Sequence, residues 1–122
     1  MKVSLFIHLA LSSGSWVLGD RGKTCQQACA KTDTTCNAEK QSTLTTNELL
    51  GAAMMEAGYT CKSFASTSSS KDGAPLSTMR RSGDCTPITP GTVSSCINNK
   101  VRRYKPLCYC EKGKVCNYNY HI

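Results

Sequence analysis

Nine cysteines are the residues of this 122-residue chain with the most reactive side chains. Thiolates bind metal ions or attack electrophiles, whereas oxidised pairs form disulfides. Zinc sites need reduced cysteines, usually at paired short spacings, whereas the N-terminal pattern described below indicates an oxidising secretory route, so we expect a disulfide framework and no bound metal. Spacing alone leaves about 105 pairings of eight cysteines open. The expected framework consists of Cys25, Cys29, Cys36, Cys61, Cys85, Cys96, Cys108 and Cys110.

The ninth cysteine, Cys116, follows this framework in the C-terminal tail. Because the number of cysteines is odd, it has three possible states. It is a free thiol, the partner of a framework cysteine, or a link between two chains. The last state predicts a covalent dimer.

Residues for acid–base catalysis are sparse. The two histidines are His8, in an apolar N-terminal segment, and His121, one residue from the C-terminus. Nothing in the spacing singles out a pair of carboxylates such as Glu48 and Glu56, and no serine lies in a Gly-x-Ser-x-Gly motif. We therefore expect no catalytic residue, no cofactor and no enzyme activity.

Basic side chains are the other candidate for function, because 15 lysines and arginines face eight acidic residues. Such a surface attracts sulfated or other anionic glycans, or an acidic extracellular protein surface. A merely solvated charged surface is the alternative, and nucleic acid is not an expected partner of a secreted chain. The predicted patch consists of Lys100, Arg102, Arg103, Lys105, Lys112 and Lys114.

The N-terminus has the pattern of a secretory signal peptide. Lys2 precedes the apolar stretch 3–11, and small residues follow. Val17 and Gly19 fit the positions before a cut, which predicts a signal peptide at 1–19 and a secreted, extracellular product. The apolar stretch is too short to span a bilayer, so no transmembrane segment is expected.

Two short helices are expected to position the first cysteines and part of the core. Thr24 and Gln27 form a capping-box pattern before a helix at about 25–31, which places Cys25 and Cys29 one turn apart on one face. A second capping box begins at Thr45, before a helix at about 46–57. In that helix Leu50, Ala53, Met54 and Ala57 recur at helical spacing, and Gly58 ends it.

The C-terminal half favours strands and turns. Pro106 has no N–H to donate, which predicts that an extended segment at 101–109 is paired on one side at most. The expected fold class is therefore a small disulfide-rich α+β domain, with the two helices packed on a small irregular antiparallel sheet from the C-terminal half. The domain would span 20–111, with a flexible serine-rich loop at 62–73 and a tail at 112–122.

Several short motifs resemble a cysteine-rich module found at the C-terminal end of N-acetylglucosaminyltransferase V-type enzymes and in secreted proteins of protists and algae. The similarity covers about 22–111. In those transferases the catalytic groups belong to a separate, larger domain, so the resemblance implies an accessory module and transfers no catalytic residue. The matching strings are Gly22-Lys23-Thr24-Cys25-Gln26-Gln27-Ala28-Cys29, Gly58-Tyr59-Thr60-Cys61, Gly73-Ala74-Pro75, Gly83-Asp84-Cys85, Ser94-Ser95-Cys96 and Pro106-Leu107-Cys108-Tyr109-Cys110.

These observations predict a secreted, disulfide-stabilised, non-catalytic binding or structural module that contacts anionic or cell-surface glycans through its basic segment. Two alternatives remain. A cationic toxin-like or defence protein shares the charge and the cysteine density, and an accessory module of a glycosyltransferase-like protein shares the motifs.

Overall fold

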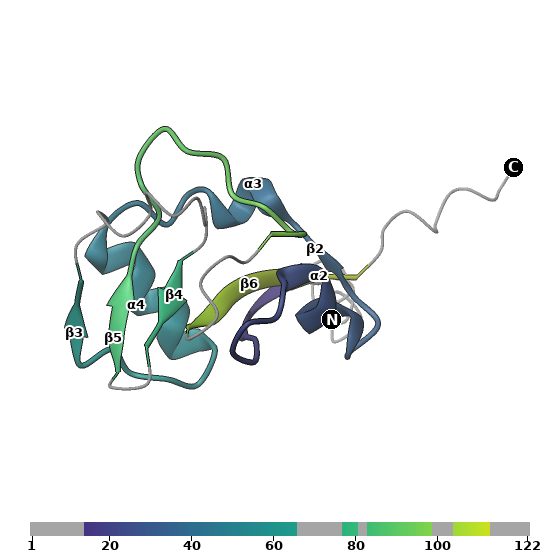
Figure 1. Ribbon diagram of the computed structural model, residues 1–122, viewed down its shortest axis with the longest axis horizontal. Coiled ribbons are helices and arrows are strands. Elements are labelled where there is room, and N and C mark those ends of the chain that lie inside the picture. The colour runs from purple at the N-terminus through teal and green to yellow at the C-terminus, as the bar shows by residue number, and fades with distance from the viewer. Residues whose placement is uncertain (1–13, 66–76, 81–82, 99–103, 113–122) are drawn as a thin grey trace, which may run out of the picture.

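A computed structural model describes residues 14–65, 77–80, 83–98 and 104–112 of the chain. Its helices and strands confirm the small disulfide-rich α+β fold (Figure 1). In chain order the elements are β1 (Gly14–Leu18), α2 (Cys25–Ala30), β2 (Thr35–Cys36), α3 (Ala38–Gln41), α4 (Asn47–Glu56), β3 (Ser63–Phe64), β4 (Thr78–Met79), β5 (Asp84–Thr86) and β6 (Lys105–Glu111).

Strand β6 is the centre of the sheet, whose strand order is β1-β6-β4-β5-β3, with β2 also paired to β6. The prediction that Pro106 restricts this segment to one partner is wrong. The ladder with β1 runs from Leu107 to Glu111, so the missing N–H of Pro106 falls outside it. The carbonyl of Pro106 still accepts a hydrogen bond of 2.8 Å from the Gly19 N–H. A proline at the beginning of a strand is therefore compatible with two neighbours.

The sheet differs from the expected one in the part of the chain that supplies its strands and in the direction of one strand pair. Strands β1 and β2 come from the N-terminal half, β3 lies near the middle of the chain, and β3 pairs with β5 in parallel. The disulfide between Cys61 and Cys85 lies beside this pair, and the Ala65 N–H donates to the Cys85 carbonyl at 2.8 Å. The predicted loop at 62–73 thus begins with a strand, and its residues 66–73 lie outside the described part of the chain.

Helix α4 has the buried face that its sequence predicts. Leu50, Ala53 and Met54 are buried, while the neighbouring Leu49 is 49% exposed. Its N-cap is Thr46 and not the expected Thr45, because the Thr46 hydroxyl accepts the hydrogen bond from the Leu49 N–H. Both candidates carry the same hydroxyl, so a shift of one residue keeps the cap and changes only which threonine supplies it.

The C-terminus of α4 is set by Gly58, whose φ of +95° is strained for residues with a side chain. The N–H of Gly58 donates to Met55 and the N–H of Tyr59 donates to Met54. These two bonds form a Schellman motif, in which the glycine satisfies the last carbonyls of the helix. The predicted stop at Gly58 is confirmed.

Helix α2 begins with the predicted capping box. The Thr24 hydroxyl accepts from the Gln27 N–H at 3.1 Å, and the Gln27 side-chain oxygen accepts from the Thr24 N–H at 2.9 Å. The helix places Cys25 and Cys29 on its buried face. Helix α3, by contrast, was not expected. Its buried Gln41 donates to the Ser94 hydroxyl at 2.8 Å and accepts from the Tyr109 N–H at 3.0 Å, so it ties α3 to two distant segments.

Two clusters of buried residues form the core. The apolar cluster lies between α4 and the sheet, and the cystine cluster lies between α2 and β6. Both include residues of β6, because successive side chains of a strand point to opposite faces. The apolar cluster contains Leu44, Leu50, Ala53, Met54, Met79, Cys85, Ile88 and Leu107. The cystine cluster contains Cys25, Ala28, Cys29, Cys108 and Cys110.

Strand β1 covers the outer edge of β6. Residues 14–18 pair with 111–107 in antiparallel register, Trp16 and Leu18 pack on the apolar cluster, and Val17 packs on the cystine cluster. A signal-peptide cut after Gly19 would therefore remove a paired strand. In the part of the chain that the structure describes, no helix has the length and apolar character needed to cross a bilayer.

Candidate anion-binding surface

The eight framework cysteines form four disulfides within the chain. Because these bonds use the whole framework, they leave no framework cysteine as a partner for Cys116, which lies outside the described residues. The same bonds mean that the framework carries no thiolates for a metal, and the described residues contain no group of three or more metal-ligating side chains. The pairs are Cys25–Cys108, Cys29–Cys110, Cys36–Cys96 and Cys61–Cys85.

Two parallel disulfides attach α2 to β6. Cys25 and Cys29 are four residues apart on a helix, which corresponds to about 6 Å along its axis. Cys108 and Cys110 are two residues apart on a strand, which corresponds to about 6.6 Å. The two spacings match, so both bonds form between the same pair of elements, with Cα–Cα distances of 5.4 and 5.3 Å.

The predicted basic patch is divided by the structure. Of its six residues only Lys105 and Lys112 lie in the described part of the chain, and Lys100, Arg102, Arg103 and Lys114 lie outside it. Lys105 begins β6 and Lys112 follows its last residue. A strand of this length separates the two lysines by roughly 20 Å, so they do not lie next to each other.

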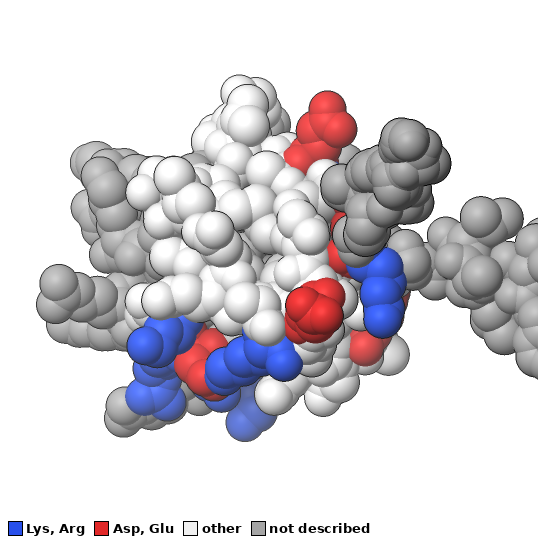
Figure 2. All heavy atoms as spheres, turned by 90° about the vertical axis from the view of Figure 1, so that its right-hand side faces the viewer, with Lys and Arg blue, Asp and Glu red and all other residues white. Residues whose placement is uncertain are grey.

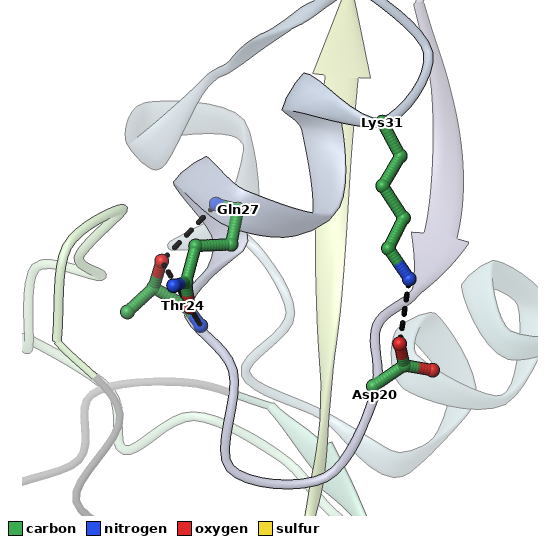
Figure 3. Close-up of polar contacts among 4 residues, drawn as sticks. All are labelled: Asp20, Thr24, Gln27 and Lys31. Carbon is green, nitrogen blue, oxygen red and sulfur yellow. Dashed lines mark hydrogen bonds and ion pairs between the residues drawn. The ribbon is translucent and has the colours of Figure 1, made fainter.

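Lys105 instead lies close to charges from the N-terminal part of the domain. The Nζ of Lys31, just after α2, donates a hydrogen bond of 2.6 Å to the Oδ2 of Asp20 (Figure 3). This hydrogen bond and the charge of Lys31 lower the pKa of Asp20, with smaller electrostatic contributions from Lys105 and Lys23. Three lysines from different parts of the chain therefore act on one carboxylate, and Lys31 bonds to it directly. We call Lys23, Lys31 and Lys105 the lysine cluster.

Two members of the lysine cluster, Lys23 and Lys31, border a shallow hollow. It has a volume of about 170 Å³ and is lined by Asp20, Lys23, Gln27, Ala28 and Lys31. A water molecule occupies about 30 Å³ of liquid, so the hollow has room for a sulfate or carboxylate group with part of the sugar or peptide that carries it. The capping box at Thr24 and Gln27 fixes the start of α2 beside the hollow (Figure 3).

Aromatic rings lie against the cations near the beginning of β6. The Lys105 Nζ is 5.9 Å from the centre of the Tyr59 ring, and the Arg80 guanidinium is 5.5 Å from that of Tyr104. Such contacts hold a cation near a ring without neutralising its charge. Figure 2 shows lysine and arginine side chains gathered along the lower edge of one face, with acidic groups between them.

A second hollow lies on the outer side of α4. Its volume is about 440 Å³, and half-exposed Phe64 and exposed Met55 contribute apolar side chains to it. Asn47, Glu48 and Thr60 supply polar groups at its border. This groove offers apolar contacts and a few hydrogen-bonding groups, and none of the described residues that line it is a lysine or an arginine.

Sequence reasoning missed the lysine cluster because it considered charges that are neighbours in the chain. Lys23 precedes the cap of the predicted first helix and Lys31 ends it, so a helix there already placed two lysines at its two ends. Their proximity to Lys105 depends on the pairing of Cys25 with Cys108. That pairing was one of many possibilities in the sequence.

Fold and surface together define a small disulfide-rich α+β domain with a lysine cluster at one end of its central strand. Comparison of the sequence with protein-family models and with curated proteins finds no match. The resemblance to the module of N-acetylglucosaminyltransferase V-type enzymes therefore stays an expectation from short motifs, and the functional argument depends on the surface itself.

Proposed function

We propose that the protein is a secreted, non-catalytic binding module that holds an anionic glycan on the lysine cluster. The observation that carries the proposal is the position of Lys23 and Lys31 on the hollow beside Asp20, with Lys105 near enough to help lower the pKa of the Asp20 carboxyl. Four intramolecular disulfides and the absence of a membrane-spanning helix among the described residues are consistent with an extracellular location.

The ion pair between Lys31 and Asp20 suits exchange with a ligand. Both side chains are 65% exposed, so the pair is solvated and contributes little to stability. A sulfate or carboxylate group of a glycan can replace Asp20 as the partner of Lys31 while it also approaches Lys23. Its polar groups then meet the lysines, and its carbon skeleton lies over Ala28 in the floor of the hollow.

Each ion pair between an exposed lysine and the glycan is weak, so binding depends on several lysines acting together. One exposed ion pair contributes about 0.2–1 kcal/mol, but three cations facing one polyanion add their attractions. The basic residues at 100–103 directly precede Tyr104 and Lys105 in the chain and would extend the attraction along a longer glycan. The affinity should therefore fall steeply as salt is added.

The test is binding of the purified protein to immobilised heparin and to its desulfated form at two salt concentrations. We expect retention on heparin at low salt, loss of retention at high salt, and little binding of the desulfated glycan. Replacement of Lys23, Lys31 or Lys105 by Gln should each weaken binding by roughly two- to fivefold.

The matched control is Lys62→Gln. Lys62 is an exposed lysine whose N–H donates to the Gly83 carbonyl beside β3 and β5, which lie at the far end of the molecule from α2 (Figure 1). Its loss removes the same charge from a different surface. Equal weakening by Lys62→Gln and Lys31→Gln would show that only net charge matters and would contradict a site at the lysine cluster. Lysis of cells at low dose without glycan binding would favour a toxin-like function.

A further inference from the structure

Arg80, at the end of β4, is a cation outside the lysine cluster. Its backbone is fixed in the turn between β4 and β5, because its N–H donates to the Asp84 carbonyl at 2.8 Å and its carbonyl accepts from the Gly83 N–H at 2.9 Å. Its side chain is exposed, and no carboxylate in the described part of the chain forms an ion pair with it. A fixed backbone therefore presents a guanidinium that is available to an anion.

The Tyr104 ring orients this guanidinium. In the pairing of β4 with β6, Met79 lies opposite Lys105, so the next residue, Arg80, lies beside Tyr104. The Arg80 Cζ is 5.5 Å from the centre of the half-buried Tyr104 ring, a distance typical of a cation–π contact. This contact leaves the guanidinium charged, and its planar fork of N–H groups matches the geometry of a carboxylate or of a phosphate-like group such as sulfate.

The Arg80 side chain lies on the face of the sheet that α2 covers. Side chains alternate along an extended chain, so Tyr104, directly before β6, shares a face with Cys108, whose disulfide joins β6 to α2. The Tyr104 carbonyl also accepts a hydrogen bond of 3.2 Å from the N–H of Gly22, which lies in the loop that lines the hollow. Gly22 and Arg80 are thus separated by two inter-strand spacings, or roughly 10 Å.

The hollow and Arg80 therefore lie along one edge of the molecule. Figure 1 shows the loop after β1, the start of β6 and the end of β4 together on its lower side. Figure 2 shows lysine and arginine side chains gathered along the same lower edge. A chain of anionic groups that enters at the hollow can follow this edge to Arg80.

We infer that Arg80 is a second anion subsite of this surface, that Tyr104 is its positioning residue, and that the ligand is an extended glycan with several anionic groups. One sulfate or carboxylate group binds beside Lys31 at the hollow, and another group further along the same glycan binds the Arg80 guanidinium. The two positions are too far apart for one anionic group to contact both. The inference rests on the proposed function and adds to it a second contact that only an extended ligand makes.

The first experiment measures the affinity of the full chain for a heparin disaccharide and for a heparin hexasaccharide by calorimetry at low salt. The hexasaccharide should bind roughly tenfold more tightly, because its second contact forms within a ligand that is already bound. Arg80→Gln should weaken binding of the hexasaccharide by roughly three- to fivefold and that of the disaccharide by less than about twofold. Lys31→Gln should weaken binding of both ligands by roughly two- to fivefold.

The matched control is Lys40→Gln. Lys40 is also exposed and also lies over a tyrosine ring, with its Nζ 5.4 Å from the centre of the Tyr109 ring. Tyr109 lies near the other end of β6, five residues and roughly 17 Å from Tyr104. The variant therefore removes an equal charge from the same kind of contact, and it should weaken binding of the hexasaccharide by less than about 1.5-fold.

A second set of variants tests the role of Tyr104. Tyr104→Phe keeps the ring and should bind the hexasaccharide like the natural protein. Tyr104→Leu removes the ring and should weaken hexasaccharide binding by roughly two- to threefold, with the disaccharide affinity unchanged. Combined with Arg80→Gln it should cause no further loss, because both variants remove the same contact. A merely structural role of Tyr104 would weaken binding of both ligands alike.

The two proposals fail in different ways. If the natural protein binds neither oligosaccharide at low salt, the glycan function itself is wrong, and the Arg80 subsite is wrong with it. If it binds both, but Arg80→Gln has the same effect as Lys40→Gln or weakens disaccharide binding as much as hexasaccharide binding, only the second subsite is wrong. Glycan binding at the lysine cluster then stands.

Discussion

The two faces of the β1–β6 pair are covered by helices that are held in different ways. Helix α4 has ten residues and packs Leu50, Ala53 and Met54 on the apolar cluster. Helix α2 has six residues, and its buried side chains are Cys25, Ala28 and Cys29. The longer helix is fixed mainly by apolar burial and the shorter one by two covalent bonds to β6.

The difference follows from helix length and from the side chains available. An isolated helix of six residues is unstable in water, and a face of one alanine and two cysteines buries little apolar surface. Two disulfides to one strand supply the missing constraint and fix the orientation of the helix as well as its distance. Because the lysine cluster lies at the two ends of α2 and the start of β6, this constraint also positions the candidate binding surface.

Loss of both disulfides of α2 should have the largest effect. Each spans more than 80 residues, but the intact Cys36–Cys96 bond shortens the ring that it closes to roughly 20–25 residues, and closing such a ring destabilises the unfolded chain by about 3.5 kcal/mol. With one bond present, the other closes only a short ring and contributes about 2.5 kcal/mol. Replacing one pair by alanine should therefore cost about 2.5 kcal/mol, and replacing both pairs should cost about 6 kcal/mol in urea-induced unfolding.

The variant that lacks Cys61–Cys85 is the control for this prediction. That disulfide closes a separate loop with a separation of 24 residues, so its loss should cost about 3.5 kcal/mol and should add to the loss of either α2 bond. If losing both α2 disulfides cost no more than the sum of the two single losses, the bonds would be independent, and the account of a shared loop would be wrong.

A substitution in α4 should have the next largest effect. Leu50→Ala removes a fully buried side chain from the apolar cluster and should cost about 3 kcal/mol. Leu49→Ala makes the same chemical change on the neighbouring residue, which is 49% exposed, and should cost less than about 0.5 kcal/mol. Both values can be measured by chemical denaturation with the disulfides intact.

The same method sharpens the comparison with α2. Ala28→Gly, at the buried alanine of that helix, should cost only about 1 kcal/mol, mostly through helix propensity. A loss at Ala28 as large as that at Leu50 would show that apolar packing holds α2 as firmly as α4. The assignment of α2 to covalent constraint would then be wrong.

Local patterns explain which parts of the fold could be predicted. The capping box at Thr24, the buried positions of α4 and the stop at Gly58 each depend on residues a few positions apart. The spacing of the cysteines also fits the pairing of α2 with β6, since four residues of helix have about the same length as two residues of strand. Applying this rule to Cys25, Cys29, Cys108 and Cys110 would have paired the two elements, but it leaves open whether Cys25 bonds to Cys108 or to Cys110.

Long-range partners explain what could not be predicted. Strand β1 has a sequence that suits both a signal peptide and a buried strand, and only its register with β6 shows the second role. Similarly, Lys105 was grouped with its neighbours in the chain, whereas the fold joins it to lysines more than 70 residues away. The sequence contained the charges but not the surface that they share.

The smallest predicted effect concerns Asp20, the acidic member of the candidate site. Lys31 lowers the pKa of Asp20 through a hydrogen bond and its charge, so the folded pKa lies below the ordinary value of 3.8. The carboxylate therefore contributes to stability above its pKa in the unfolded chain, and this contribution disappears as the pH falls through the folded pKa. Asp20→Asn should lower the Tm slightly at pH 6 and not at pH 2.

Asp33→Asn is the matched control, because it removes another exposed carboxylate, on the loop after α2, where a φ of 59° suits asparagine as well as aspartate. A pH-dependent difference in Tm between the two variants would assign the effect to the lysine cluster. If both variants showed the same difference in Tm from the natural protein at every pH, the ion pair with Lys31 would add no stability beyond the effect of removing one negative charge. In the first case Asp20→Asn should also bind heparin more tightly at neutral pH, because a competing anion has been removed from Lys31.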